Sequence, residues 1–182
     1  MPNRVARVLW VLVLALMGGW ALGTDSPSAA RAPKAYVGLF KDDAVAVVDT
    51  AQNKVLGTIA VPKGPHGLVV TPDGRKVYVS SDGASTVSVI DTATDRVVTS
   101  IEVGANPHGL AVSGDGSRVL VLGWGSNRAL IIDTATDRVS GEVPVAQPHN
   151  GTLSRDGRTG GWPPSSRAPR RWSGWISPPG RK

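Results

Sequence analysis

The feature that most constrains this chain of 182 residues is an internal repeat with a spacing of 42 residues. An apolar segment ending in Asp-Thr-Ala occurs three times, and its aspartates are Asp49, Asp91 and Asp133. Two other markers recur in phase with it: Pro-His-Gly or Pro-His-Asn at 65–67, 107–109 and 148–150, and an Asp-Gly turn at Asp73, Asp115 and Asp156. A repeat of this period predicts one supersecondary unit per copy.

Each copy has the pattern of four short strands. In the third copy, residues 109–113 and 118–122 are β-rich runs joined by Gly114-Asp115-Gly116, which is typical of a hairpin. A loop at 124–127, a strand ending at Asp133, a turn at 134–137 and a last strand at 138–145 complete it. No convincing helical periodicity follows residue 23. Four antiparallel strands in about 40 residues form a β-propeller blade of the WD40-like kind.

Dividing the chain on this pattern predicts an all-β fold, an incomplete propeller over residues 34–159. Residues 67–103 and 109–145 are two full blades, 34–61 are strands two to four of an earlier blade, and 151–159 begin another. The ring does not close within these residues. Two exposed strand edges are then left, and they favour self-association or aggregation.

The same residues resemble the YVTN-type, or YncE-like, β-propeller repeat family. Its Tyr-Val strand, Val-x-Val-Ile-Asp-Thr strand and Pro-x-Gly to Asp-Gly hairpin are matched by residues 78–91 and 65–74. Residues 119–121 lack the tyrosine, and Ser80-Ser81 replaces the usual Thr-Asn. The resemblance extends over about residues 35–158 and implies a propeller that has about seven blades when complete.

The N-terminus predicts export. Arg4 and Arg7 precede an apolar run, and Ala21-Leu22-Gly23 offers a cleavage site, so residues 1–23 are predicted to be a signal peptide. The alternative is an uncleaved anchor, but Gly18-Gly19 interrupts the run before the roughly 20 residues that a spanning helix needs. Residues 24–33 are then a linker, and no transmembrane span remains after cleavage. Without cysteine there is neither a disulfide nor a lipid-attachment site, and a periplasmic or extracellular product is expected.

The formal charge of +6 lies outside the repeats. Residues 31–154 contain 11 basic and 12 acidic side chains, whereas residues 155–182 contain seven basic side chains and only Asp156. A nucleic-acid partner is therefore not predicted, because it needs a basic face on the folded part.

Residues 160–182 break the repeat and form a basic tail rich in Pro, Trp and Arg, predicted to be disordered. The next repeat aspartate is due at 174, because Asp91 follows Asp73 by 18 residues. Trp is encoded only by TGG and Ile codons begin with AT, so Trp175-Ile176 contains GAT, an aspartate codon, in the frame offset by two bases. We therefore hypothesise a frameshift near Gly160 that truncated the propeller; the alternative is a genuine tail.

Three histidines, His66, His108 and His149, occupy equivalent positions in the three copies. The connection that carries them crosses one face of the propeller toward its axis. One hypothesis is that they ligate copper or zinc or help to hold haem there. The other is that each ring fixes its own loop and recurs because the repeat was duplicated, in which case no cofactor is predicted.

The repeated aspartates need no catalytic explanation. Asp49, Asp91 and Asp133 end strands, and Asp73, Asp115 and Asp156 lie in hairpins, where side-chain oxygens accept free backbone N–H groups. No nucleophile and base pair is recognisable, so no enzyme is predicted.

The leading hypothesis is an exported binding or scaffold module with a protein or small-molecule ligand on the histidine-bearing loop face. The alternatives are a fragment of a metal-, haem- or quinone-associated redox propeller, since the resemblance extends to such relatives, and a truncated product without function.

Overall fold

The computed structural model describes residues 33–161, which contain the strands β1 to β13 and no helix. Accordingly, this range holds no helix long and apolar enough to cross a membrane. Chain contacts divide the protein into two units, residues 1–31 and 32–182, and every described residue belongs to the second. The predicted signal peptide, most of the predicted linker, and residues 162–182 of the predicted tail lie outside the described residues. The hypothesis of a frameshift near Gly160 stays a prediction.

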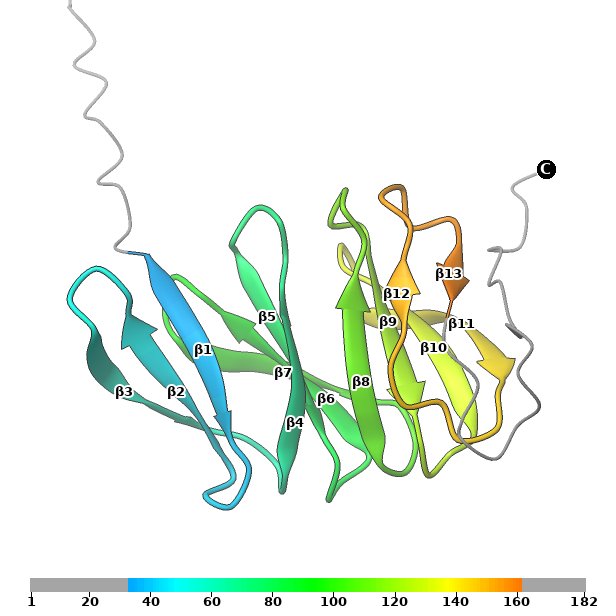
Figure 1. Cartoon of the computed structure of the whole chain (residues 1–182), viewed down its shortest axis with the longest axis horizontal. Helices are drawn as coiled ribbons and strands as arrows, with labels where there is room; N and C mark the ends of the chain where they lie inside the picture. The colour runs from blue at the N-terminus through cyan, green and yellow to red at the C-terminus, as the bar shows by residue number, and fades with distance from the viewer. Residues whose placement is uncertain (1–32, 162–182) are drawn as a thin grey trace, which may run out of the picture. The chain divides into compact units, whose positions relative to one another are not determined.

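The strands form a series of antiparallel sheets (Figure 1). The first sheet contains β1 (Lys34–Leu39), β2 (Ala44–Asp49) and β3 (Lys54–Ala60). The second contains β4 (Pro65–Val70), β5 (Lys76–Ser81), β6 (Thr86–Asp91) and β7 (Arg96–Glu102). The third contains β8 (Pro107–Val112), β9 (Arg118–Gly123), β10 (Arg128–Asp133) and β11 (Arg138–Pro144). The short pair β12 (Thr152–Leu153) and β13 (Gly160–Gly161) follows.

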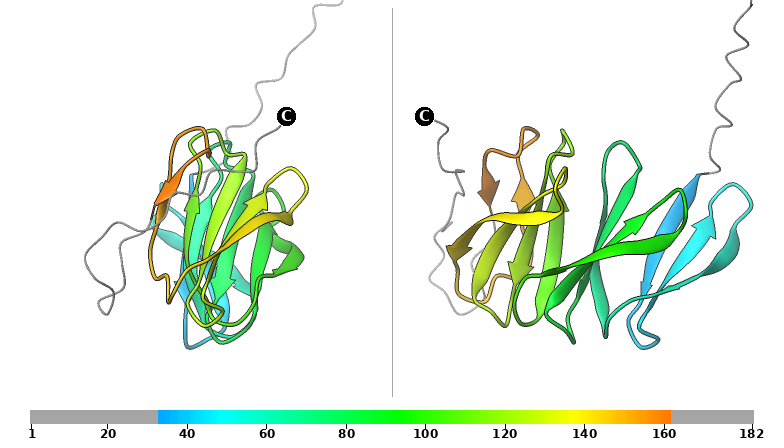
Figure 2. Two further views of the ribbon diagram at one scale, coloured as in Figure 1. Left: turned by 90° about the vertical axis from the view of Figure 1, so that its right-hand side faces the viewer. Right: turned by 180° about the vertical axis from the view of Figure 1, so that it is seen from behind.

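Each sheet is a blade whose strands are paired in chain order. β4 and β8 are the innermost strands of their blades and contact one another, and β1 and β12 contact these inner strands in turn. β3, β7 and β11 are the outermost strands, as the two further views also show (Figure 2). The predicted all-β fold, with two full blades and partial blades on either side, is confirmed.

Burial follows the position of a strand within its blade. The second and third strands of the full blades, β5, β6, β9 and β10, are buried along most of their length, because each blade is covered on both faces. This explains their continuous apolar runs, which do not alternate as a half-exposed strand does. The outermost strands are mostly exposed.

The hydrophobic core lies between blades. One cluster joins the first and second blades through Val45, Val47 and Ile59 on one side and Val77, Val79 and Ile90 on the other. A second cluster joins the second and third blades. In it, Tyr78 and Val89 pack with Val119 and Ile132. A third lies on the far face of the third blade around Leu120, Leu122, Ala129 and Ile131, with Leu153 of β12 against it.

Two local features were not expected from the sequence. The Pro-His dipeptides, predicted to lie in the connections, begin β4 and β8, and Pro65 is opposite Ser81. Proline is tolerated at the first position of a strand because the missing N–H is not needed there. In each blade, the pairing of the two outer strands also shifts register at the equivalent position of the repeat. In the first blade this position lies between Val47 and Val48. Such a bulge increases local twist.

Candidate functional site

The three repeat-equivalent histidines lie side by side at one end of the blades. The ring centroids of His66 and His108 are 3.6 Å apart and those of His108 and His149 are 4.1 Å apart, with interplanar angles of 40° and 44°. The structure thus brings all three residues together, although each belongs to a different blade. We call His66, His108 and His149 the histidine row.

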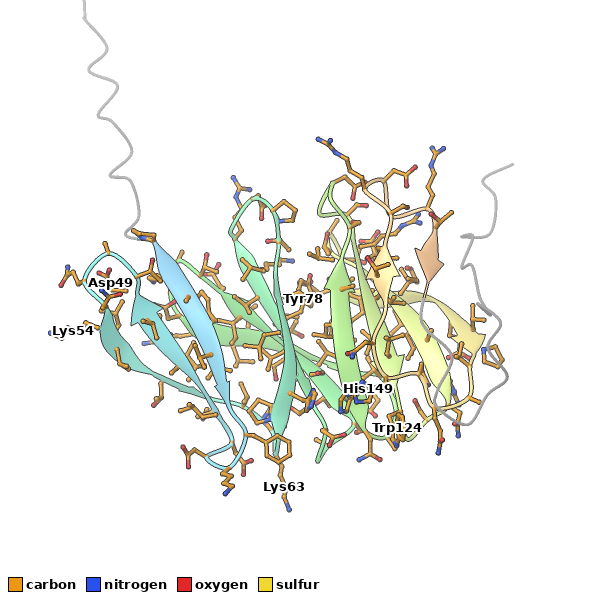
Figure 3. All side chains as sticks on the ribbon, in the orientation of Figure 1. Asp49, Lys54, Lys63, Tyr78, Trp124 and His149 are labelled. Atoms are coloured by element: carbon orange, nitrogen blue, oxygen red, sulfur yellow. The ribbon has the colours of Figure 1, made fainter. Side chains whose placement is uncertain are left out.

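An aromatic side chain lies at each end of the histidine row. Phe40 packs edge-on to His66 at 6.4 Å, and Trp124 packs edge-on to His149 at 5.7 Å. Both come from loops between the second and third strands of their blades. Phe40 is 52% exposed and Trp124 is 37% exposed, so neither is part of the core. Figure 3 shows Trp124 beside His149 at the end of the blades opposite to Asp49.

Close approach of the innermost strands makes this stacking possible. Gly67 donates its N–H to the Ser80 hydroxyl at 2.9 Å, and the same hydroxyl donates to the His108 carbonyl at 2.6 Å. A Cβ atom on Gly67 would lie 2.5 Å from the His108 carbonyl oxygen. A Cβ atom on Gly109 would likewise collide with the His149 carbonyl oxygen. Glycine after the histidine therefore lets adjacent blades approach until their imidazoles touch.

His108, in the centre of the row, differs from its neighbours. It is half-buried, whereas His66 and His149 are exposed, and its Nδ1 is buried without a hydrogen-bond partner. Burial lowers the pKa of His108, and the charges of His66 and His149 lower it further; Asp82 opposes this shift. The central ring is therefore neutral near neutral pH.

The stacking geometry bears on the metal hypothesis. The rings lie against one another instead of converging on one point, and residues 33–161 contain no group of three His, Cys, Asp or Glu side chains that could hold a metal ion. Binding of copper, zinc or haem at His66, His108 and His149 stays a prediction.

The repeated aspartates lie at the opposite end of the blades and bond to their own turns. Asp49 accepts the N–H groups of Ala51 and Gln52 at 2.8 and 2.9 Å. Asp91 and Asp133 repeat this pattern with the residues two and three positions later. In the hairpins, hydrogen bonds lower the pKa values of Asp73, Asp115 and Asp156, chiefly those from Thr71, Ser113 and Ser154 respectively.

A pocket of about 330 Å³ lies at this turn end. Its lining includes Thr71, Asp73, Lys76 and Thr134. These polar groups bond within the protein: Thr71 donates to Asp73 at 2.6 Å, and the Thr134 hydroxyl donates to the Gly116 carbonyl at 2.6 Å. The pocket is thus formed by groups that already stabilise turns.

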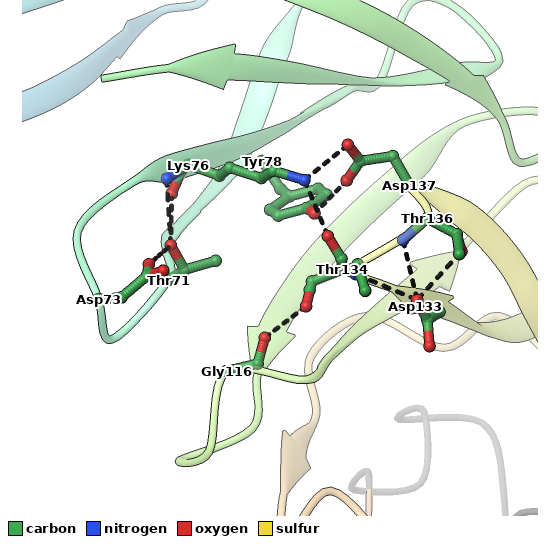
Figure 4. Close-up of polar contacts among 10 residues, drawn as sticks. Thr71, Asp73, Lys76, Tyr78, Gly116, Asp133, Thr134, Thr136 and Asp137 are labelled. Carbon is green, nitrogen blue, oxygen red and sulfur yellow. Dashed lines mark hydrogen bonds and ion pairs between the residues drawn. The ribbon is translucent and has the colours of Figure 1, made fainter. Parts of the chain in front are cut away.

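A polar contact that was not expected from the sequence recurs between blades. Lys76 and Tyr78 of β5 both reach Asp137 of the next blade, and the Lys76 ammonium lies 2.7 Å from the carboxylate (Figure 4). Lys76 also donates to the Thr134 carbonyl at 2.8 Å. Burial and the Asp137 carboxylate raise the pKa of Tyr78, so its hydroxyl remains a donor. We call this Lys-x-Tyr to Asp contact the interblade clamp.

The interblade clamp has an equivalent one blade earlier. There Lys34 and Tyr36 of β1 reach Asp95, at 2.6 Å from the ammonium and 2.7 Å from the hydroxyl. The lysines, tyrosines and aspartates of the two clamps are each 42 residues apart, which is the signal that could have revealed them. Asp95 and Asp137 both have a φ of 52°, a left-handed conformation that Asp and Asn adopt more readily than most residues.

Comparison with known proteins agrees with the arrangement of strands in four-stranded blades. No curated protein sequence matches the chain significantly. Among solved structures, a chain of Kuenenia stuttgartiensis hydrazine synthase is similar, with a TM-score of 0.67 and 26% sequence identity. The match covers 81% of the present chain but only 47% of that chain, so this protein spans about half the length of its structural neighbour. The family model for YNCE-like beta-propellers matches residues 20–158. The stacked four-stranded blades and this match over most of the sequence show that the chain belongs to the YNCE-like β-propeller family.

Proposed function

We propose that this protein is an exported, non-enzymatic binding or scaffold module whose ligand contacts the end of the blades that carries the histidine row. The observation that carries the proposal is that Phe40, His66, His108, His149 and Trp124 line up in contact. His108 is half-buried and the other four side chains are exposed, and none of the five belongs to the core, which lies between the blades.

The row offers two kinds of contact to a protein or small-molecule ligand. The faces and edges of Phe40 and Trp124 provide apolar area, and exposed aromatic residues contribute strongly to binding surfaces. The imidazole nitrogens provide hydrogen-bond donors and acceptors. The centroids of neighbouring rings in the row are 3.6 and 4.1 Å apart. The turn end offers less, because its polar side chains already bond to one another.

The test is recovery of the ligand with the protein from its native source, followed by native mass spectrometry. We expect His66→Ala combined with Trp124→Ala to abolish recovery of the ligand. Arg75→Ala, at the exposed turn end, is the matched control and should retain it. If the double variant recovers the same ligand in the same amount, the histidine row is not the binding site.

A redox role is the second candidate, and the similarity to a hydrazine synthase chain supports it. In this case a metal, haem or quinone would accompany the protein. Visible absorption and elemental analysis of the protein from its native source distinguish the two candidates. A stoichiometric chromophore or metal that disappears in His108→Ala would favour the redox role, and a colourless, metal-free protein that retains another ligand would favour the binding module.

A further inference from the structure

The aromatic residues beside the histidine row occupy one position of the repeat. Phe40, Asp82 and Trp124 follow one another at intervals of 42 residues. Each is the first residue after the second strand of its blade, which is β1, β5 or β9. The loop position that carries an aromatic ring in the first and third blades therefore carries a carboxylate in the second.

Each of these loop residues accompanies one histidine. Phe40 and Trp124 pack edge-on to the first and last histidines of the row. The Asp82 carboxylate acts electrostatically on the central ring, His108, and raises its pKa against the effect of burial. We call Phe40, Asp82 and Trp124 the loop row. It places one negative charge between two aromatic rings.

The Asp82 carboxylate has no partner in the described part of the chain. Asp82 is half-buried, and its backbone N–H donates to the Gly64 carbonyl at 2.8 Å while its carbonyl accepts the Asn106 side-chain amide at 2.6 Å. The carbon atoms of Lys63 lie against Gly83, yet none of the ion pairs among the described residues involves Asp82. A half-buried carboxylate is stabilised by a cation, and here the protein supplies none.

The charges of the surrounding loops favour a cation over an anion. These loops contain two lysines and three aspartates, and the central imidazole is neutral. Those of the second half of the row contain no charged side chain at all. Figure 3 shows Lys63 and Trp124 at this end of the blades. The loops are residues 40–43, 61–64, 82–85, 103–106, 124–127 and 145–149.

We propose that the loop row binds an organic cation, with an alkylammonium group next to the Asp82 carboxylate and its apolar substituents against Phe40 and Trp124. This inference rests on the proposed binding function of the histidine end and names the class of its ligand. The face of an aromatic ring attracts a cation, most strongly when the ring is tryptophan, and the carboxylate adds a direct charge interaction. An organic cation also brings apolar surface, which the two exposed rings can cover.

The first experiment titrates the full chain with two cations and one uncharged analogue by isothermal titration calorimetry. The probes are choline, n-butylammonium and dimethylbutanol, the neutral isostere of choline. We expect the better cation to bind about tenfold more tightly than the neutral isostere. Tighter binding of choline assigns a quaternary ammonium group, and tighter binding of n-butylammonium assigns a primary one. Equal affinity for the charged and uncharged probes, or no binding of either cation, overturns the proposal.

The second experiment tests the role of the carboxylate. Asp82→Asn should weaken binding of the cation about fivefold and leave the affinity for dimethylbutanol unchanged. Asp42→Asn is the matched control, because it removes the same charge from an exposed residue at the same end, and it should keep the wild-type affinity. The thermal midpoint of Asp82→Asn should be no lower than that of the wild-type protein, since no ion pair is lost. A folded Asp82→Asn that binds the cation as the wild type does overturns the proposal.

Failure of this inference can be told apart from failure of the proposed function. Recovery of the native ligand tests whether the histidine end binds anything, and the titrations test whether a positive charge is recognised there. Suppose that His66→Ala with Trp124→Ala abolishes recovery of the native ligand, while choline and its isostere bind the wild-type protein equally. The binding module would then stand, and the organic cation would be excluded as its ligand class.

Discussion

At the scale of single residues, the positions next to the blade axis allow the least change. Gly67, Ser80 and the His108 carbonyl form a continuous contact across two blades, and the stacking of the imidazoles depends on it. The sequence placed the three histidines on one face, since the repeat puts them at equivalent positions. It could not show that the rings touch, because the separation of neighbouring inner strands is set by glycines and by a serine hydroxyl from a different strand.

Replacing Gly67 with alanine should destabilise the protein by about 1–3 kcal/mol, because the new Cβ would meet backbone atoms that cannot move independently. Gly57→Ala is the control: no atom lies within 4 Å of the position of its Cβ, so the substitution should be neutral or slightly stabilising. Urea denaturation of the two variants measures the difference. Equal midpoints would mean that the inner strands are not in close contact.

His108 should make the protein less stable in acid. The unfolded chain has a His108 pKa near the ordinary 6.5, and the folded chain has a lower one. Between these values the unfolded state binds more protons, so the free energy of unfolding falls as the pH falls below about 6.5. Urea midpoints measured from pH 8 to pH 5 should therefore depend less on pH in His108→Gln than in the wild-type protein. Parallel pH profiles would contradict this assignment.

At the scale of strands and blades, the structure differs from the predictions mainly in where strands begin and in the contacts between neighbouring blades. The strands themselves could be predicted, because apolar runs and Asp-Gly or Asp-Thr turns repeat in phase. The inclusion of Pro65 and His66 in β4 was missed, because it depends on the pairing of Pro65 with Ser81 of β5 beyond a register shift. The interblade clamps were missed because a lysine and an aspartate 61 residues apart show no relation until the blades are stacked.

Removing the charge of one clamp should weaken the contact between two blades. Asp137→Asn keeps a residue suited to a φ of 52° but loses the ion pair with the partly buried Lys76, at an expected cost of about 1–3 kcal/mol. Glu142→Gln removes the partner of Arg128 in an exposed pair and should cost less than about 0.5 kcal/mol. Thermal denaturation compares them. A cost for Asp137→Asn no larger than that of Glu142→Gln would show that the clamp contributes little.

At the scale of the whole molecule, the proposed export depends on residues 1–23, which lie outside the described residues. If residues 1–23 are a signal peptide, the protein recovered outside the cytoplasm should begin at Thr24. N-terminal sequencing of the fractionated protein measures this, with a variant carrying Arg4→Glu and Arg7→Glu as the export-deficient control. A mature protein that keeps Met1 in the membrane fraction would instead support an anchor.

The interblade clamps also determine how the blades can come apart. Each clamp joins one blade only to the next, so the chain is a linear array of units with couplings between nearest neighbours. In such an array the loss of a terminal blade removes a single coupling and leaves the others intact, so opening begins at whichever end is least strongly held. Heating should therefore produce a sequence of partial transitions that starts at one end of the array, rather than one cooperative event.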